Sequence, residues 1–325
     1  MAPNRRLDRM LDRRLLFVTG KGGVGRTTVA AVLGLVAAGR GLRTIVAAVG
    51  GRDELPRLLG PDEGRPGRTG DGDPAGERDL GSGLFSIAID PQQAMEEYLR
   101  DQLRVGALAD MLSSSRTFGY LAAATPGLRE LLTVGKVWEL AQPERRAAGG
   151  DPYDLVIVDA PATGYAISLM AAPRTFAALA RRGPISRHAA TIHETLVDPR
   201  MTGVVGVTTA AEPAVNEILE TGGRLERELG IGLDGVIVNA LRPSRFARRD
   251  RARLRAALAG DPTPAVRQAL ILALAADDEV RVERAQLRRV TEGVTDRPFE
   301  LPLIRAEELG REALIGVGKL LEEAE

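Results

Sequence analysis

A run of nine residues, GKGGVGRTT, constrains this chain more than any other segment. One apolar run, residues 15–18, precedes it, and another, residues 29–33, follows it. That order predicts a strand, a glycine-rich turn and a helix, which is the setting of a phosphate-binding loop. Backbone N–H groups in such a loop and the positive end of the helix dipole hold phosphate. The predicted phosphate-binding residues are Gly20, Lys21, Gly22, Gly23, Val24, Gly25, Arg26, Thr27 and Thr28.

Two basic residues make this loop unusual. The position before the Thr pair, which normally carries the phosphate-binding Lys, is Arg26, and a second basic residue, Lys21, stands at the front. Only three of the 44 basic residues are lysines, so Lys21 is notable in a chain that otherwise uses arginine. Arg26 has two interpretations. It follows the same arginine bias, or it indicates altered turnover, because a planar guanidinium does not replace a compact ammonium group.

Composition narrows the classes of function. The 325 residues include 44 acidic and 44 basic side chains and no cysteine. The zero net charge gives no indication of nucleic-acid binding, and the lack of cysteine excludes disulfides and thiolate metal sites. The charged N-terminus lacks the apolar stretch of a signal peptide, and no run approaches the ~18 apolar residues of a membrane span. We therefore expect a cytoplasmic protein with no transmembrane segment and no nucleic-acid partner.

Apolar runs alternate with helical patterns along the chain. Strands are predicted at residues 15–18, 44–49, 84–89, 155–158, 204–207, 236–238 and 299–301. Such continuous apolar strands, joined by helical crossovers, indicate an α/β fold with a mostly parallel sheet covered by helices on both faces. We assign residues 1–325 to one P-loop NTPase domain. Its nucleotide-binding core would comprise residues 14–60, 84–91, 151–173 and 201–325, its helical subdomain 92–148 and 174–200, and a disordered loop 61–83.

A second motif begins at Asp159, at the end of the predicted strand 155–158, and reads DAPATGYAISLMAAP. An Asp in that position orients water bound to Mg²⁺, so Thr27 and Asp159 are the predicted metal-binding residues. This stretch and the phosphate loop resemble switch II and the deviant Walker A motif of the ArsA-type ATPases. That family includes arsenical pump-driving ATPases and ATPases that target tail-anchored membrane proteins. Further segments similar to family motifs follow in the same order: IDPQQAMEEYL, PGLRELLTVGKVWEL and LPLIRAEELGREAL.

The resemblance implies ATP and Mg²⁺ as cofactors and a dimer in which Lys21 reaches the partner's nucleotide. It also implies that Asn239 hydrogen-bonds adenine and that Pro302 and Leu303 pack near the base. Without the family context, Asn239 would be interpreted as a turn former at a strand end. Helices around switch II would form an apolar groove for a client protein helix, although simple core packing is the favoured interpretation for most of its residues. The groove candidates are Met95, Leu99, Met111, Leu112, Leu121, Leu131, Leu132, Val137, Leu169 and Met170.

Three positions around the expected γ-phosphate depart from the family pattern. Gly50 stands where switch I of the family has an Asp that positions the attacking water, Tyr165 stands where switch II has His, and Arg26 replaces Lys. Asp53 lies three residues beyond Gly50 and substitutes only if that loop is rebuilt. The candidate catalytic residues are thus Lys21, Arg26, Asp53 and Asp159. Loss of a general base typically slows a reaction by about 10²–10⁴-fold, so we expect ATP binding with slow hydrolysis.

Three functions remain open on the sequence alone. The leading hypothesis is an ATP-binding subunit, paired with a related chain that has an intact site, which couples nucleotide state to the binding of a client or partner protein. The alternatives are a competent homodimeric ATPase and a nucleotide-binding scaffold that does not hydrolyse. The lack of cysteine disfavours arsenite transport and removes the zinc-binding pair of the targeting branch. Two histidines, His188 and His193, are expected on the surface rather than at a metal site.

Overall fold

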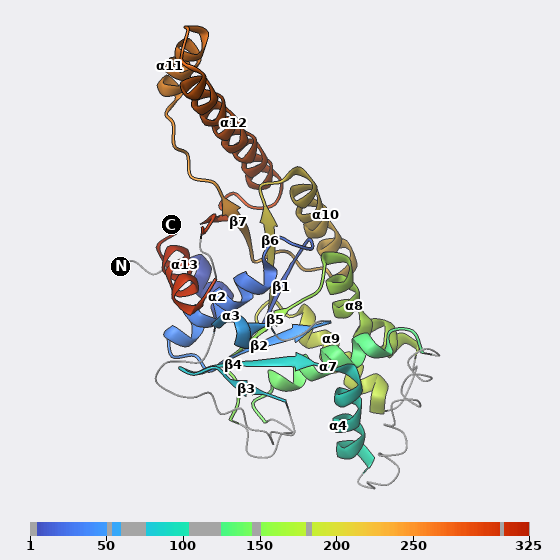
Figure 1. Cartoon of the computed structure of the whole chain (residues 1–325). Helices are drawn as coiled ribbons and strands as arrows, with labels where there is room; N and C mark the ends of the chain where they lie inside the picture. The colour runs from blue at the N-terminus through green and yellow to red at the C-terminus, as the bar shows by residue number, and fades with distance from the viewer. Residues whose placement is uncertain are drawn as a thin grey trace.

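The computed structural model describes residues 5–50, 54–59, 76–103, 125–144, 151–179, 184–305 and 309–324. Its centre is an eight-stranded sheet with the strand order β3-β4-β2-β5-β1-β6-β7-β8 (Figure 1). Seven strands run parallel, and β3 pairs antiparallel with β4 at one edge. The predicted α/β fold with a mostly parallel sheet is confirmed. The strands are β1 (Leu15–Gly20), β2 (Thr44–Val49), β3 (Arg78–Asp79), β4 (Leu84–Ile89), β5 (Leu155–Asp159), β6 (Thr202–Thr209), β7 (Gly235–Leu241) and β8 (Phe299–Pro302).

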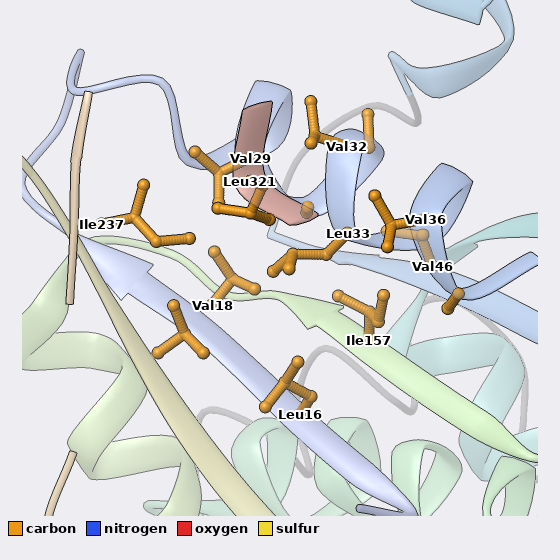
Figure 2. Close-up of a cluster of buried hydrophobic side chains, with 14 of the residues drawn as sticks. Leu16, Val18, Val29, Val32, Leu33, Val36, Val46, Ile157, Ile237 and Leu321 are labelled. Carbon is orange, nitrogen blue, oxygen red and sulfur yellow. The ribbon is translucent and has the colours of Figure 1, made fainter. Parts of the chain in front are cut away.

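Both faces of the sheet are covered, and β1 shows how its sequence achieves this. Leu16 and Val18 pack into one apolar cluster, which Figure 2 shows together with Leu33 and Ile157. Leu15 and Phe17 point into a second cluster, because successive strand residues face opposite sides. Helices α1 (Arg5–Leu11), α2 (Arg26–Gly39), α3 (Leu55–Leu59) and α13 (Arg311–Glu323) cover the first face. The second face is covered by α7 (Leu128–Leu140), α8 (Thr163–Leu179), α9 (Pro184–Val197) and α10 (Glu212–Leu229).

Helices α4 (Pro91–Leu103), α7, α8 and α9 pack together beside the sheet. An ion cluster around the buried Lys136 holds α4 and α7 together. Lys136 on α7 lies 2.7 Å from Glu97 on α4 and 3.1 Å from Glu139 on its own helix. The Trp138 indole N–H donates to the Thr195 hydroxyl of α9 at 3.0 Å. These contacts lie between described residues of the expected helical subdomain, residues 92–148 and 174–200, and that division stays a prediction.

The two histidines lie in this helical region and are half-buried, whereas surface positions were expected. The His188 ring packs edge-on against Trp138, with ring centroids 5.0 Å apart, and His193 is half-buried. Among the groove candidates, Met111, Leu112 and Leu121 lie outside the described residues, and no side-chain placement is described for Leu99. Five others are buried in the core, which agrees with the packing interpretation: Met95, Leu131, Val137, Leu169 and Met170.

Two helices form an arm that projects from the sheet. After β7 the chain runs out to α11 (Arg248–Ala259) and returns along α12 (Pro264–Gly293), at the top of Figure 1. The base of the arm is held by an ion pair between Arg242 and Glu283 and by Val290, which packs with α10. Residues 201–325 were assigned to the nucleotide-binding core from the sequence. The helical pattern after residue 244 is present, but most of this hairpin covers neither face of the sheet.

The segment expected to be disordered, residues 61–83, is only partly described. Residues 61–75 lie outside the described part. Residues 76–83 differ from the expectation, because β3 pairs with β4 and Leu80 is buried against the core. No helix among the described residues is long and apolar enough to cross a membrane.

Candidate nucleotide site

The phosphate loop adopts the predicted strand, turn and helix. Gly20 ends β1, and α2 begins at Arg26. Gly23 and Gly25 have φ angles of +83° and +91°, which side chains other than glycine rarely adopt. A Cβ on Gly25 would lie 2.3 Å from the Asn239 side-chain nitrogen, and a Cβ on Gly20 would lie 2.0 Å from the Val207 carbonyl oxygen. The loop therefore depends on glycine both for its conformation and for its close fit against β6 and β7.

The two predicted metal-binding residues meet at the carboxyl ends of β1 and β5. The strands are adjacent and parallel, with Val18 opposite Asp159. The Thr27 hydroxyl donates a hydrogen bond of 2.7 Å to a carboxylate oxygen of Asp159. A hydroxyl and a carboxylate are the hard oxygen donors that Mg²⁺ prefers, and Mg²⁺ usually takes few protein ligands beside substrate phosphates. The residues present therefore fit this ion.

Both basic residues of the loop are bonded within the chain. The Arg26 guanidinium donates to the Ala160 carbonyl oxygen at 2.7 Å, which ties the start of α2 to the residue after Asp159. The Lys21 ammonium lies 3.6 Å from a carboxylate oxygen of Glu217, and its side chain is 43% exposed. The other Glu217 oxygen accepts a 2.6 Å hydrogen bond from the Thr163 hydroxyl at the start of α8. Glu217 thus connects the front of the phosphate loop to switch II.

Sequence analysis did not identify Glu217. It lies on the crossover helix α10, and a single glutamate on an amphipathic helix carries no signal that separates it from a solvated one. Its role follows only from the topology, because β6 ends at the same edge as β1 and α10 starts there.

The residues expected near the base lie on β7 and β8 and the segment after them. The Asn239 amide donates to the Val24 carbonyl oxygen at 2.9 Å, so its nitrogen supports the phosphate loop. The next residue, Ala240, has a φ of +60°. Leu303, 38% exposed, lines a cavity of about 810 Å³ together with Thr209 and Ala240 on the sheet edge. Arg242, Ala275, Glu279 and Val282 also line this cavity, from the arm and its base, and Pro302 ends β8.

The altered switch positions lie at the same edge. Gly50 follows β2 with a φ of +75°, and a Cβ there would lie 3.2 Å from a Pro161 side-chain carbon. Asp53 lies outside the described residues. Tyr165 is 38% exposed, and burial, together with its hydrogen bond to Glu130, raises the pKa of its hydroxyl. Because residue 50 is glycine, it supplies no carboxylate to position the attacking water.

Comparison with known proteins places this geometry in a family. The family model described as anion-transporting ATPase matches residues 13–188, more than half of the chain. The chain belongs to this ArsA-type ATPase family. ATPase BagA of Mycobacterium tuberculosis is 30% identical to it over 254 residues, covering 75% of this chain and 70% of BagA. ATPase ARSA1 of Chlamydomonas reinhardtii is 24% identical to it over 185 residues, covering 50% of this chain and 22% of ARSA1.

Family membership confirms the resemblance drawn from the two motifs. ArsA-type ATPases use ATP and Mg²⁺, so ATP hydrolysis is the class of reaction that this fold serves. The matched range contains the phosphate loop, Gly50, Asp159 and Tyr165, but not Asn239, Pro302 or Leu303. The roles assigned to individual residues remain predictions.

Proposed function

We propose that this chain is an ATP-binding subunit of a dimeric ArsA-type ATPase, paired with a related chain, that hydrolyses ATP slowly or only with its partner. It would couple nucleotide state to the binding of a client or partner protein in the cytoplasm. One observation carries the proposal. Thr27 and Asp159 are paired at 2.7 Å, whereas the Gly50 position has no side chain that could position water. Groups that bind are thus present, whereas among the described residues the Gly50 position supplies no group for hydrolysis.

We assign a role to each group of the site from its contacts. Loop amides between Gly20 and Thr28 would hold the phosphates, and Thr27 and Asp159 would hold Mg²⁺. When bound, Mg²⁺ neutralises charge on the transferred phosphoryl group. Arg26 would hold the Ala160 carbonyl in place rather than act as a mobile point charge, because its guanidinium is already bonded there. Leu303 and the cavity beside it would accommodate the base.

Lys21 is suited to act on a partner's nucleotide. Its contact with Glu217 is long, at 3.6 Å, and both side chains are at least 30% exposed. Exposed ion pairs of this kind contribute little, at most about 1 kcal/mol, so a phosphate is able to replace Glu217. Loss of that contact would free Glu217, whose other oxygen holds Thr163 at the start of α8.

Helix α8 connects this edge to the candidate client region. Leu169 and Met170 on α8 are buried in the cluster on the second face of the sheet, and Phe176 on the same helix lines an apolar cavity of about 200 Å³ with Met95 and Leu131. A shift at Thr163 would therefore reach this cavity along α8, which continues through Pro173. Apolar cavities between helices suit the side chains of a client helix, which supports coupling of nucleotide state to a client.

The test is ATP binding and turnover measured on the same preparation. We expect the chain alone, with Mg²⁺, to bind a fluorescent ATP analogue and to hydrolyse ATP little, with turnover appearing when the related subunit is added. Lys21→Ala would remove that turnover and leave binding intact, while the matched control Lys319→Ala would change neither. Fast turnover by the chain alone that disappears in Lys21→Ala would instead indicate a competent homodimer. An absence of ATP binding would overturn the proposal.

A further inference from the structure

Two exposed apolar side chains line one cavity from segments that are distinct in the chain. Val282 on α12 is 60% exposed, and Leu303, which follows β8, is 38% exposed. Both line the cavity of about 810 Å³ that Thr209 and Ala240 line from the carboxyl ends of β6 and β7. A cavity with apolar side chains at this edge of a parallel sheet is typical of a ligand site. The foot of the arm therefore supplies part of the wall of such a site.

The charged residues of the cavity indicate which end of a nucleotide it can hold. Among the described residues that line it, Arg242 is the one basic side chain, and its guanidinium is bonded to Glu283 and lies 3.3 Å from Glu279. The third carboxylate in the lining, Asp278, is bonded to Arg251 of α11. The cavity thus offers a phosphate group no uncommitted guanidinium.

The same carboxylates suit the neutral end of a nucleotide. Carboxylate oxygens accept hydrogen bonds, and the amino group of adenine and the hydroxyls of ribose donate them. The Glu279 side chain is 59% exposed, so it is accessible to such a donor. Together with Val282 and Leu303, it gives the cavity the mixture of apolar surface and a few polar groups that binds a small molecule.

The cavity and the phosphate loop are joined by adjacent residues of β7. The Asn239 amide donates to the Val24 carbonyl oxygen in the loop, and the next residue, Ala240, lines the cavity. The foot of α12 lies beside this strand (Figure 1). A nucleotide whose phosphates occupy the loop can therefore direct its base toward α12.

We propose that α12 forms one wall of the base site, and that Val282 packs on the base of bound ATP together with Leu303. The inference rests on the proposed function, because it requires ATP in the phosphate loop. It adds a contact that the family resemblance does not supply. That resemblance places only Asn239, Pro302 and Leu303 near the base, and the family match ends at residue 188, before the arm. The base would cover two apolar side chains that otherwise face water.

Calorimetric titration with two ligands separates the base from the phosphates. ATP and inorganic tripolyphosphate, each with Mg²⁺, both carry three linked phosphates, but only ATP carries a base. We expect Val282→Asp to weaken ATP binding by about tenfold, because it removes an apolar contact with the base. Its affinity for tripolyphosphate should not change. Val282→Leu keeps the apolar contact and should bind ATP within about twofold of the wild-type affinity.

Val266→Asp is the matched control. Val266 is 50% exposed on the same helix, and it is not among the residues that line the cavity. This change should alter the affinity for neither ligand. Leu303→Asp should weaken ATP binding as Val282→Asp does, and the losses of the two changes should not add in the double variant, because both side chains contact one base. Far-ultraviolet circular dichroism would check that each variant keeps its helices.

Three results for the variants would overturn the inference. They are unchanged ATP binding by Val282→Asp, an equal loss of both ligands in Val282→Asp, and an equal loss of ATP in Val266→Asp. A wild-type chain that binds tripolyphosphate as tightly as ATP would also contradict it, because the base then contributes nothing, while the role of the phosphate loop in the proposed function would stand. A wild-type chain that binds neither ligand would instead overturn the proposed function itself.

Discussion

Replacing Lys136 by Met tests how the helical subdomain is held together. The Lys136 side chain is 7% exposed and lies within 3.1 Å of Glu97 and Glu139, whose side chains are 32% and 5% exposed. Two opposite charges at that distance attract by about 5 kcal/mol at an effective dielectric constant of 20, and desolvation offsets most of this. Without the lysine, the cost of burying the Glu139 carboxylate remains, and no opposite charge offsets it. We expect Lys136→Met to lower the free energy of unfolding by about 3–5 kcal/mol.

The assay is urea unfolding followed by tryptophan fluorescence. Trp138 is the only tryptophan, and it lies two residues from Lys136 on α7, so its emission reports this region alone. The matched variant replaces Lys136 by Met and Glu139 by Leu together, which removes the stranded buried charge as well. It should recover most of the lost stability, because apolar replacement of a buried ion pair is often neutral. A loss below about 1 kcal/mol in the single variant would refute the reasoning.

The same ion cluster predicts a dependence on alkaline pH. Burial alone would lower the pKa of Lys136, but the charge of Glu139 and the hydrogen bond to Glu97 outweigh it and raise that pKa above its ordinary value of 10.5. A raised pKa means that the contribution to stability is complete below the ordinary value and is lost as pH rises through the folded value. The difference in stability between wild type and Lys136→Met should therefore be constant from pH 7 to 9 and shrink at higher pH.

Two further changes test the loop and the half-buried His193. Gly25→Ala should weaken binding of a fluorescent ATP analogue, because φ is +91° there and the new Cβ would lie 2.3 Å from the Asn239 side chain. The control is Gly39→Ala, because a Cβ at Gly39 would meet open space. Equal ATP affinity of the two variants would contradict the close fit of the loop. Burial, and then the charge of Arg174, lowers the pKa of His193, so protonation should destabilise the fold as pH falls through about 6.5. His193→Gln should remove that part of the acid sensitivity in thermal melts, and identical pH profiles would count against it.

The sequence predicts the sheet well because its strands are continuous apolar runs. Val156, Ile157 and Val158 can only be buried on both faces, and burial on both faces requires a parallel sheet with helical crossovers. The pairing of Thr27 with Asp159 is also predictable, because both follow strands that end at one edge.

Other features depend on contacts between distant segments. Glu217 is one of several acidic residues on α10, and only the fold brings it to Lys21 and Thr163. The Asn239 side chain was assigned to adenine, yet its nitrogen is bonded to Val24 in the loop. The arm falls within residues 201–325, which the sequence assigned to the nucleotide-binding core, and the sequence does not predict that an apolar residue such as Leu272 is exposed there. A local sequence pattern predicts the helix, but it does not predict whether another segment packs against that helix.

The arm also has a mechanical consequence. Residues 264–278 of α12 extend beyond the contacts that Glu279, Glu283 and Val290 make at the foot of the arm, and fifteen helical residues form a rod of about 22 Å. A rotation of about 10° at the base would displace the tip of that rod by about 4 Å, while the sheet edge moves by a fraction of that distance. Because the foot of the arm adjoins the cavity lined by Leu303, a rotation beside the candidate adenine site would be amplified at the arm tip. Dye pairs between the arm tip and α13 would detect movements too small to see at the site itself.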